Sequence, residues 1–533
     1  MSRQPVLIVG GNLVGLSAAL CLAAHNVPTI VFEKHAKISE HPRAIGFTAR
    51  TLEIFHALGI SDQIPEVPSD FTLLRARVES LTGKWFERTS WQDTTEKPSH
   101  DQQTAENESK PTSGEKGQYS PFRGAAIPQD KLESILEKAA LSRGVDIRRQ
   151  HTVTKVEQND SEVLVTVLDA QGTSHQLRGL YLIAADGNRS GIREQLQIAR
   201  TGRGHMQIMR SVLFRAPLED YLKGVHQFNI EQGDFKAFLT TYNDGRWVLM
   251  FYDDLERDSK TQIADIRRAV GKSDIPVEII TTGRWEMTAL VAERFQVGRI
   301  FLAGDAAHAL PPNRGGYGAN TGIHDAHNLA WKIAAVLKEE SMPELLDTYD
   351  AERRPVALLR HDQIFVRADY KMHLEGKDAG ERLDDDAMEF GELYRSRGVI
   401  GAEDGLSPAK KPDEWKGQPG THLPHFWVTK AGKTVSIADV TGMHGWTVVS
   451  ASVEWGDAVR KLNERSPVKL KHLHIGQDVQ LNGSQNLTEL MGLSNTGASL
   501  VRPDGYIAWR TVEIPCDPVD DLLQALNQVA FIQ

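Results

Sequence analysis

The sequence predicts an α/β protein in which a parallel, doubly wound sheet is interrupted by an antiparallel sheet and followed by a second α/β unit. Three observations predict this arrangement. Residues 6–33 read as strand, glycine turn, helix and strand, residues 205–290 alternate apolar and polar in short runs, and a Pro-, Gly- and Lys-rich linker spans 400–420. Unbroken apolar runs indicate buried parallel strands, whereas alternation indicates strands with one buried face.

Composition bounds the class of protein. The chain of 533 residues has room for two or three domains, and its 40% hydrophobic and 25% charged residues are typical of globular proteins. A net charge of −10 argues against a nucleic-acid surface, and no apolar stretch approaches the length of a membrane span. The N-terminus does not read as a signal peptide, and two distant cysteines, Cys21 and Cys516, fit a reducing compartment. We therefore expect a cytoplasmic enzyme.

The first strand–turn–helix–strand unit carries the parts that a dinucleotide needs. Gly10 allows a sharp turn, the helix N-terminus offers N–H groups to a pyrophosphate, and Gly15 allows close packing of helix and strand. Glu33 ends the second strand, where it can accept hydrogen bonds from a ribose diol. Asn12 replaces the middle glycine of G-x-G-x-x-G; because Asn tolerates a left-handed backbone, we expect the turn to survive with its side chain facing the phosphates. A purely structural glycine turn is the alternative.

Two later strand patterns end beside an acid. Residues 181–184 lead to Asp186 and Gly187, and residues 299–303 lead to Gly304 and Asp305. An Asp at the carboxyl end of a strand in a doubly wound sheet points into the ligand crevice, where it can hold a ribityl or ribose hydroxyl. Capping of the following helix is the alternative role for each acid.

The remaining elements follow in order. Residues 94–120 have almost no apolar content, so we expect a mobile surface insertion there. A helix is expected at 130–141, with strands at 145–147 and 162–167. A glycine-rich turn at 315 leads into a long helix that ends near 339.

Taken in this order, the three motifs resemble the class A flavoprotein monooxygenases, the single-component aromatic hydroxylases. The resemblance covers residues 5–370 and also rests on the segments 41–46, 50–55 and 129–133. Residues 420–427 and 497–510 resemble the thioredoxin-like tail of the phenol and polyketide hydroxylase branch. The tail has no C-x-x-C, so dithiol chemistry is excluded there and we expect it to serve packing or a homodimer contact.

The resemblance implies a specific domain organisation. A Rossmann-type FAD-binding domain is expected at 1–200 and 291–400, with an inserted antiparallel-sheet substrate domain at 201–290. A C-terminal thioredoxin-like domain is expected at 415–533. FAD is the implied cofactor, and NADPH or NADH is the implied transient co-substrate.

The resemblance also assigns cofactor contacts. Arg43 is expected beside the moving flavin ring, with a surface arginine paired to Glu40 as the alternative. The helix N-terminus near Ala319 and Asn320 is expected to stabilise negative charge on the reduced flavin. Compared with the family's loop, this loop has one extra residue near Asn313 and Arg314. The assignment of the flavin contact to Ala319 and Asn320 therefore stays open by one position. The expected cofactor-binding residues are Gly10, Asn12, Leu13, Val14, Gly15, Glu33, Lys34, Arg43, Gln129, Val153, Asp186, Gly304, Asp305, Pro312, Gly318, Ala319 and Asn320.

The substrate is expected between the 205–290 sheet and the flavin. Alternation places only half of the polar and aromatic side chains on the inner face, and an aromatic on such a sheet is more often core than ligand contact. No general base can be identified from the sequence, and we name no catalytic residue. The substrate candidates are Arg210, Phe228, Phe238, Trp247 and Tyr317.

The activity implied is hydroxylation of a phenolic or polycyclic polyketide-like ring. NAD(P)H would reduce FAD, O2 would add as a C4a-hydroperoxide, and its distal oxygen would pass to the ring. Baeyer–Villiger insertion, epoxidation and a non-oxygenating FAD-binding protein stay open. A halogenase is disfavoured because the sequence lacks W-x-W-x-I-P. We expect no metal, because His308 and His324 have no partners at ligand spacing.

Overall fold

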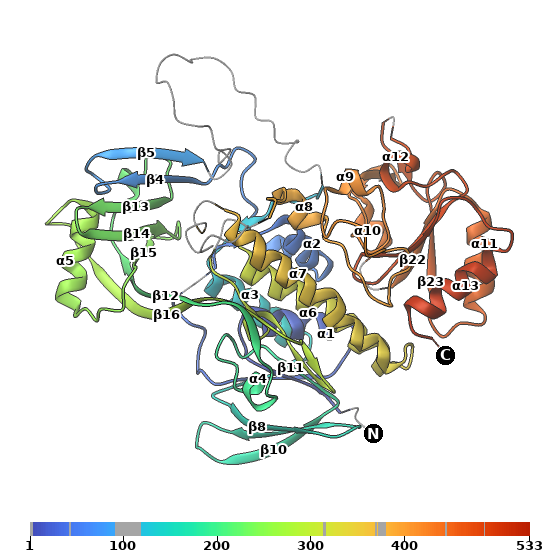
Figure 1. Cartoon of the computed structure of the whole chain (residues 1–533), viewed down its shortest axis with the longest axis horizontal. Coiled ribbons are helices and arrows are strands. Elements are labelled where there is room, and N and C mark those ends of the chain that lie inside the picture. Colours follow the sequence, from blue (N-terminus) through green and yellow to red (C-terminus); the bar gives the residue numbers. More distant parts are fainter. Residues whose placement is uncertain are drawn as a thin grey trace.

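The computed structural model describes residues 4–41, 44–90, 119–312, 316–367, 370, 380–442, 445–483 and 485–532. A central α/β body lies between an antiparallel sheet and a C-terminal α/β domain (Figure 1). The insertion expected at 94–120 lies almost wholly outside the described residues, as does Arg43.

A six-stranded sheet forms the centre of the molecule, in the order β17-β18-β11-β1-β2-β7. All neighbouring pairs in it are parallel except β17 with β18. Parallel strands present their carboxyl ends at one edge, which is where the motifs at 10–15, 33 and 186 lie. The strands are β1 (Val6–Val9), β2 (Thr29–Glu33), β7 (Asp146–Arg149), β11 (Tyr181–Ala184), β17 (Gln296–Val297) and β18 (Ile300–Leu302).

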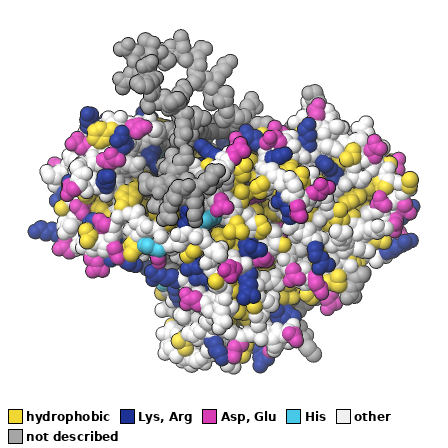
Figure 2. Space-filling view, viewed as in Figure 1, with side chains coloured by type: hydrophobic (Ala, Val, Ile, Leu, Met, Phe, Trp, Pro, Cys, Tyr) yellow, Lys and Arg dark blue, Asp and Glu magenta, His cyan; other side chains and the backbone are white. Residues whose placement is uncertain are grey.

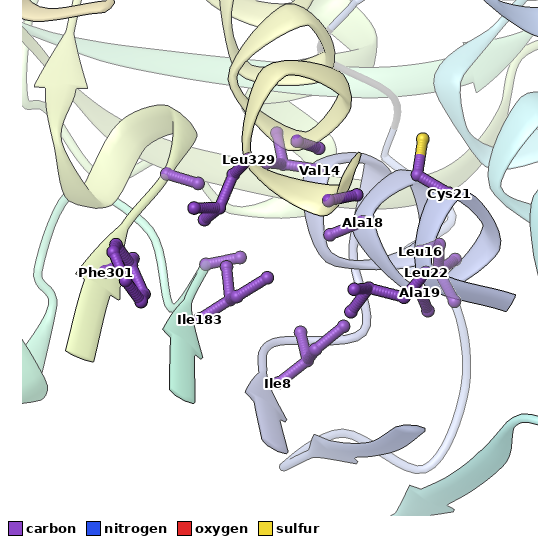
Figure 3. Close-up of a cluster of buried hydrophobic side chains, with 14 of the residues drawn as sticks. Ile8, Val14, Leu16, Ala18, Ala19, Cys21, Leu22, Ile183, Phe301 and Leu329 are labelled. Carbon is purple, nitrogen blue, oxygen red and sulfur yellow. The ribbon is translucent and has the colours of Figure 1, made fainter. Parts of the chain in front are cut away.

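Helix α1 (Leu13–Ala24) is apolar on all sides because it is covered on all sides. Ile8, Ile183 and Phe301, from three strands of the central sheet, share one buried cluster with residues of α1 and with Leu329 of α6 (Tyr317–Leu337) (Figure 3). Leu16, which α1 contributes to this cluster, is fully buried. Full burial of such a side chain stabilises the fold by about 1.5–3 kcal/mol.

Smaller elements complete the central body. A three-stranded antiparallel sheet is made of β8 (Thr152–Gln158), β9 (Val163–Leu168) and β10 (Ser174–Gly179). Strands β3 (Gly46–Phe47) and β6 (Ala125–Ala126) form a short pair. The further helices are α2 (Ala49–Ala57), α3 (Gln129–Ser142), α4 (Gly191–Gln195), α7 (Thr348–Phe365) and α8 (Asp385–Phe390), with the 3-10 turn η3 (Gly304–Ala306).

An eight-stranded sheet has the order β19-β16-β12-β15-β14-β13-β4-β5. Helix α5 (Ser259–Val270) packs on one of its faces. The substrate domain was expected at 201–290 alone, but residues 74–90 join its sheet because β13 pairs in parallel with β4. The strands are β4 (Leu74–Val78), β5 (Trp85–Ser90), β12 (Arg200–Arg215), β13 (Gln227–Gln232), β14 (Phe235–Thr241), β15 (Arg246–Phe251), β16 (Glu278–Ala292) and β19 (His308–Ala309).

The C-terminal domain has a four-stranded sheet in the order β23-β22-β25-β26. Strands β22 (Trp446–Ser450) and β23 (Leu470–His474) are parallel, whereas β25 (Ala498–Val501) and β26 (Ile507–Thr511) are antiparallel neighbours. With α11 (Glu454–Asn463) and α13 (Pro518–Val529), this is the expected thioredoxin-like arrangement. Its remaining elements are α9 (Pro412–Trp415), β20 (Trp427–Lys430), β21 (Lys433–Ser436), α10 (Ile437–Thr441), β24 (Gln480–Leu481) and α12 (Leu487–Met491).

The surface carries charges of both signs. On the face shown in Figure 2, Lys and Arg side chains are interspersed with Asp and Glu. No helix in the described ranges combines the length and hydropathy that a membrane crossing requires.

Candidate functional site

The turn between β1 and α1 can be built only with glycine at two positions. Gly10 has φ +109°, and a Cβ there would lie 2.3 Å from the carbonyl oxygen of Ala185. A Cβ on Gly15 would lie 1.8 Å from the carbonyl oxygen of Gly10. Backbone atoms therefore occupy the space that a side chain would need, and the carboxyl ends of β1 and β11 approach closely.

Asn12 has a different role from the one expected. Its φ of −98° and ψ of −173° are extended, so the expectation of a left-handed residue was wrong; Gly10 supplies the positive φ instead. Asn12 caps α1, accepting from the N–H groups of Val14 (3.0 Å) and Gly15 (3.3 Å). Its amide donates to Ala185 O at 2.6 Å. Two N–H groups that were expected to meet a pyrophosphate are thus bound by this side chain.

The start of α3 is tied to the same turn through Glu133. The N–H of Leu13 donates to Glu133 Oε1 at 3.0 Å, and Gln129 Nε2 donates to the same oxygen at 2.7 Å. Gln129 Oε1 accepts from the N–H of Ala44 at 3.2 Å. Gln129 therefore lies between the glycine turn and the chain that follows β2, and Glu133, which the sequence analysis used only as part of the segment 129–133, contacts the turn directly.

Glu33 is buried at the end of β2 beside the glycine turn. Its Oε2 accepts from the N–H of Gly11 at 2.7 Å, and its Oε1 accepts from the N–H of His35 at 2.8 Å. Its backbone carbonyl accepts from the N–H of His151, which leads into β8 and to the half-buried Val153. Lys34 is exposed.

Asp186 follows β11 and holds an unused acceptor. Its Oδ2 accepts from the N–H of Ile192 at 3.2 Å, whereas its buried Oδ1 has no hydrogen-bond partner in the described structure. Burial raises the pKa of Asp186. Arg193 then joins the two acid-bearing loops, because its guanidinium donates to the carbonyls of Asn188 and Ala306, each at 3.1 Å.

Gly304 lies where α1, η3 and α6 meet. Its φ is +59°, and a Cβ there would lie 2.8 Å from Val14 Cγ2. A Cβ on Gly322 would lie 3.0 Å from the Cα of Gly304 and 2.6 Å from the same Val14 methyl. Asp305 is half-buried in η3, next to this contact.

Asp325 of α6 is a buried anchor that the sequence analysis missed. Its Oδ2 accepts from the N–H of Gly304 (3.2 Å) and lies 2.7 Å from His308 Nε2, and its Oδ1 accepts from Arg353 Nε (2.8 Å). Burial alone would raise the pKa of Asp325, but His308 and Arg353 lower it to about 2. His308, considered above as a metal ligand, thus serves this anchor, and among the described residues no group of three ligand-type side chains suits a metal.

The first turn of α6 presents backbone groups. The helix begins at Tyr317, and the N–H groups of Gly318 and Ala319 lie where helices have no internal partners. A Cβ added to Gly318 would meet no heavy atom within 4 Å. The N–H of Asn320 was also expected to face the flavin, but it donates to Gly316 O at 3.3 Å.

The side chain of Asn320 braces the start of α2. Its Oδ1 accepts from the N–H of Thr48 (3.1 Å) and from Thr51 Oγ1 (2.7 Å). Pro312 accepts a hydrogen bond from the hydroxyl of Tyr370 through its carbonyl. The loop residues Asn313 and Arg314 lie outside the described residues, so their contacts stay predictions.

The eight-stranded sheet has two unlike faces, which separate the substrate candidates. Phe228 and Trp247 are fully buried in the cluster under α5, so their bulk fills a core and we withdraw them as substrate contacts. Arg210 shares that face, opposite Phe251, and pairs with Asp254 at 2.8 Å. We withdraw it as well, because it lies on the sheet face that packs against α5 and not on the face of Phe238.

The other face is turned toward the chain that follows β2. One row across it carries Phe238, Met250 and Ser211. Ser211 Oγ lies 2.9 Å from His41 Nε2, and Leu213 and Val248, one row along, cluster with Ile45. Phe238 therefore keeps its candidate role, and His41 and Ser211 join it; no local pattern in the sequence distinguished them.

Tyr317 lies in a cationic environment next to Gly318. It is buried, and its hydroxyl accepts from Arg367 Nη2 at 3.2 Å. The guanidinium carbon of Arg360 lies 5.3 Å from the ring centroid. Arg367 is 7% exposed, and its Nε and Nη1 have no hydrogen-bond partner in the described structure. Arg367 Nη2 also donates to Asp385 Oδ1, so the charge of Arg367 is already paired. The two remaining donors suit a further oxygen acceptor.

The chain is similar to proteins of known activity over nearly its whole length. A family described as "FAD binding domain" matches residues 3–362, and one described as "Aromatic-ring hydroxylase, C-terminal" matches 416–530. The chain is 36% identical over 548 residues to tetracenomycin A2 monooxygenase-dioxygenase of Streptomyces glaucescens, covering 98% of this chain and 96% of that protein. It is 34% identical over 552 residues to 4-methyl-5-nitrocatechol 5-monooxygenase of a Burkholderia species, covering 98% and 97%.

The likeness extends to solved structures. The ternary complex of aklavinone-11 hydroxylase with FAD and aklavinone aligns with 99% of this chain and 99% of its own, with a TM-score of 0.86 and 29% identity.

Proposed function

The chain belongs to the FAD-binding aromatic-ring hydroxylases, and from this premise we propose that it hydroxylates a phenolic, polycyclic polyketide-like ring with NAD(P)H and O2. The relatives named above act on tetracenomycin A2 and on a nitrocatechol, and the aligned structure holds aklavinone. One observation carries the proposal. The sheet face with Phe238 and Ser211 is turned toward His41 and Ile45, and the neighbouring Ala44 is joined to the glycine turn through Gln129 and Glu133.

The residues present fit FAD. The glycines at 10 and 15 let backbone strands approach closely, and Asp186 keeps one carboxylate oxygen without a partner. Glu33 would accept from ribose hydroxyls, and Asp186 and Asp305 from ribose or ribityl hydroxyls. Bound FAD supplies the reduction and oxygen chemistry, which no amino-acid side chain provides.

The chain's own residues then bind, orient and stabilise charge. The N–H groups of Gly318 and Ala319, at the positive end of the 21-residue helix α6, would donate to the edge of the cofactor that becomes anionic. Phe238 offers an aromatic wall for the substrate. Arg367, which is paired with Asp385 but has two unpartnered donors beside Tyr317, would donate to an oxygen of the substrate.

We also propose a reducing, intracellular compartment, because both cysteines are unpaired, Cys21 being buried and Cys516 exposed. A homodimer stays a prediction, to be checked by sedimentation of the holoenzyme. The remaining cofactor and substrate residues likewise stay predictions.

The direct test is oxidation of NADPH and NADH by the purified holoenzyme with a panel of phenols, naphthoquinones, anthraquinones and tetracyclines. We expect one class to stimulate oxidation with little peroxide and to yield a ring-hydroxylated product. A ring-expanded lactone or ester would identify Baeyer–Villiger insertion instead. No stimulation by any aromatic compound, in a protein that holds FAD, would contradict oxygenation.

A further inference from the structure

Four buried charged side chains join the C-terminal domain to the central body. We call Arg502, Asp504, Glu352 and Lys332 the interdomain ionic cluster; none is more than 1% exposed. Arg502 donates two hydrogen bonds to Glu352 of α7, at 2.6 and 2.9 Å, and two to Asp504, at 3.0 and 2.5 Å. Lys332 of α6 donates to Glu352 at 2.8 Å. The cluster thus has two positive and two negative groups.

Packing of two domains does not by itself require buried charged side chains. Removing four charges from water is costly, and apolar residues of similar volume often pack an interface at least as stably. What charged groups add is directional hydrogen bonding, which fixes one relative position of the parts. The four residues are therefore suited to hold the segments that contact them in one position.

Buried contacts, joined by one step along the backbone of α7, lead from Arg502 to the loop that carries Gly304 and Asp305, here called the GD loop. Glu352, which binds Arg502, is followed in α7 by Arg353. Arg353 donates to Asp325 Oδ1 at 2.8 Å and to the carbonyl of Thr321 at 3.3 Å. Asp325 in turn accepts from the N–H of Gly304 and from His308. Arg502 and Gly304 are thus linked through Glu352, Arg353 and Asp325.

A second branch leads from the same C-terminal loop to the first turn of α6. Arg50 of α2 donates to the carbonyl of Asp504 at 3.1 Å and to Glu53 at 2.7 Å. The next residue of α2, Thr51, donates to Asn320. Both branches therefore end at backbone segments that carry the expected cofactor contacts.

We propose that Arg502 is a positioning residue for FAD, so that the C-terminal domain helps to hold the GD loop and the start of α6 in their ligand-binding arrangement. This inference rests on the proposed function for the identity of the ligand. It gives the thioredoxin-like domain, which lacks a dithiol, a role in the reaction without contact to the reacting atoms.

The test compares Arg502→Met with Arg510→Met. Arg510 belongs to the same domain, but it donates to the carbonyls of Lys416, Gly417 and Met491, away from the path. The measurements are the FAD dissociation constant, from flavin fluorescence during titration of the apoprotein well below its Tm, and the Tm itself. We expect Arg502→Met to weaken FAD binding at least tenfold, whereas Arg510→Met lowers Tm but leaves the FAD constant within twofold of wild type. An unchanged FAD constant in folded Arg502→Met would overturn the proposal.

Arg502→Lys keeps the test decisive if Arg502→Met does not fold. Lysine keeps the charge but cannot make the paired contacts of a guanidinium with Glu352, so we expect FAD binding a few-fold weaker. Wild-type FAD affinity in this variant would overturn the proposal in the same way. Combining Arg502→Lys with Arg353→Lys should give a non-additive change in FAD affinity, because both residues lie on one path; strictly additive effects would contradict that path. Since FAD binding is read without substrate, these outcomes are separate from failure of the hydroxylation assay.

Discussion

The two ends of helix α6 meet the rest of the protein in opposite ways. At its N-terminus, Gly318 has no heavy atom near its missing side chain, and the first N–H groups have no helical partner. Toward its C-terminus, Lys332 is fully buried in the interdomain ionic cluster, and the Trp331 ring meets Trp446 edge-on at 5.9 Å. One end of the helix therefore presents backbone donors that helix geometry leaves over, whereas the other end is covered by a second domain, where Lys332 is paired with Glu352 although Trp331 Nε1 has no hydrogen-bond partner among the described residues.

Gly15→Ala gives the largest expected effect and tests how rigid the ligand end is. A Cβ there would lie 1.8 Å from Gly10 O, so the turn could relax only by moving the start of α1 away from Gly10. We expect no recoverable folded protein, measured as soluble yield and circular dichroism. Gly191→Ala is the control, because its Cβ would meet nothing within 4 Å and should fold normally. A soluble yield of Gly15→Ala equal to that of the wild-type protein would show that the turn can accommodate a Cβ at position 15.

Asp325→Asn tests the anchor between the two ends. The change leaves Arg353 buried without its carboxylate partner, so we expect a loss of about 3–5 kcal/mol in the free energy of unfolding, together with weaker FAD binding. Asp457→Asn, in an exposed pair with Arg460, should cost at most about 1 kcal/mol. Denaturant titration measures both. Equal losses in the free energy of unfolding for the two variants would show that the contacts of Asp325 stabilise the fold no more than an exposed ion pair does.

Lys332→Met tests the domain end through pH. Burial lowers the pKa of Lys332 from 10.5 to about 8, so between these values the unfolded chain binds a proton that the folded chain has released. The free energy of unfolding of wild type should therefore rise with pH from about 8 to 10, by about 2–3 kcal/mol more than that of Lys332→Met. Urea titrations at pH 7, 8, 9 and 10 measure the difference. Parallel pH profiles would mean that Lys332 titrates normally.

Gly318→Ala gives the smallest expected effect and isolates the ligand. Because the added methyl would meet no protein atom, the Tm of the apoprotein should stay within about 1 °C, or rise slightly from the helix preference of Ala. If the cofactor lies against this turn, FAD binding should weaken about tenfold, which is about 1.4 kcal/mol. An FAD affinity equal to that of wild type would show that the cofactor does not contact the first turn of α6.

The sequence predicted best what a short segment encodes by itself. The order strand, glycine turn, helix and acid identified the turn at Gly10 and Gly15 and the position of Glu33 at the end of the second strand, because glycine and strand patterns are local. Even there, Asn12 was assigned the wrong conformation. Its replacement of a glycine suggested a positive φ, but the cap of α1 needs an extended residue with an acceptor.

Features that depend on distant pairing could not be predicted. The alternation in 205–290 predicted a sheet with two different faces. Which face is core depends on the position of α5, which covers Phe228 and Trp247 but not Phe238. Likewise, no local pattern joins Arg502 to Glu352, because the two residues are 150 positions apart and meet only when the domains pack. The anchor at Asp325 depends on the same kind of long-range contact.

We expect FAD to bind at the carboxyl edge of the six-stranded sheet and at the start of α6. The most direct measurement is the visible absorption spectrum and flavin content of the purified protein, before and after incubation with FAD and removal of excess. We predict a yellow protein with close to one FAD per chain. The wild-type protein should release this FAD only under denaturing conditions. A colourless protein that takes up no FAD would contradict the account.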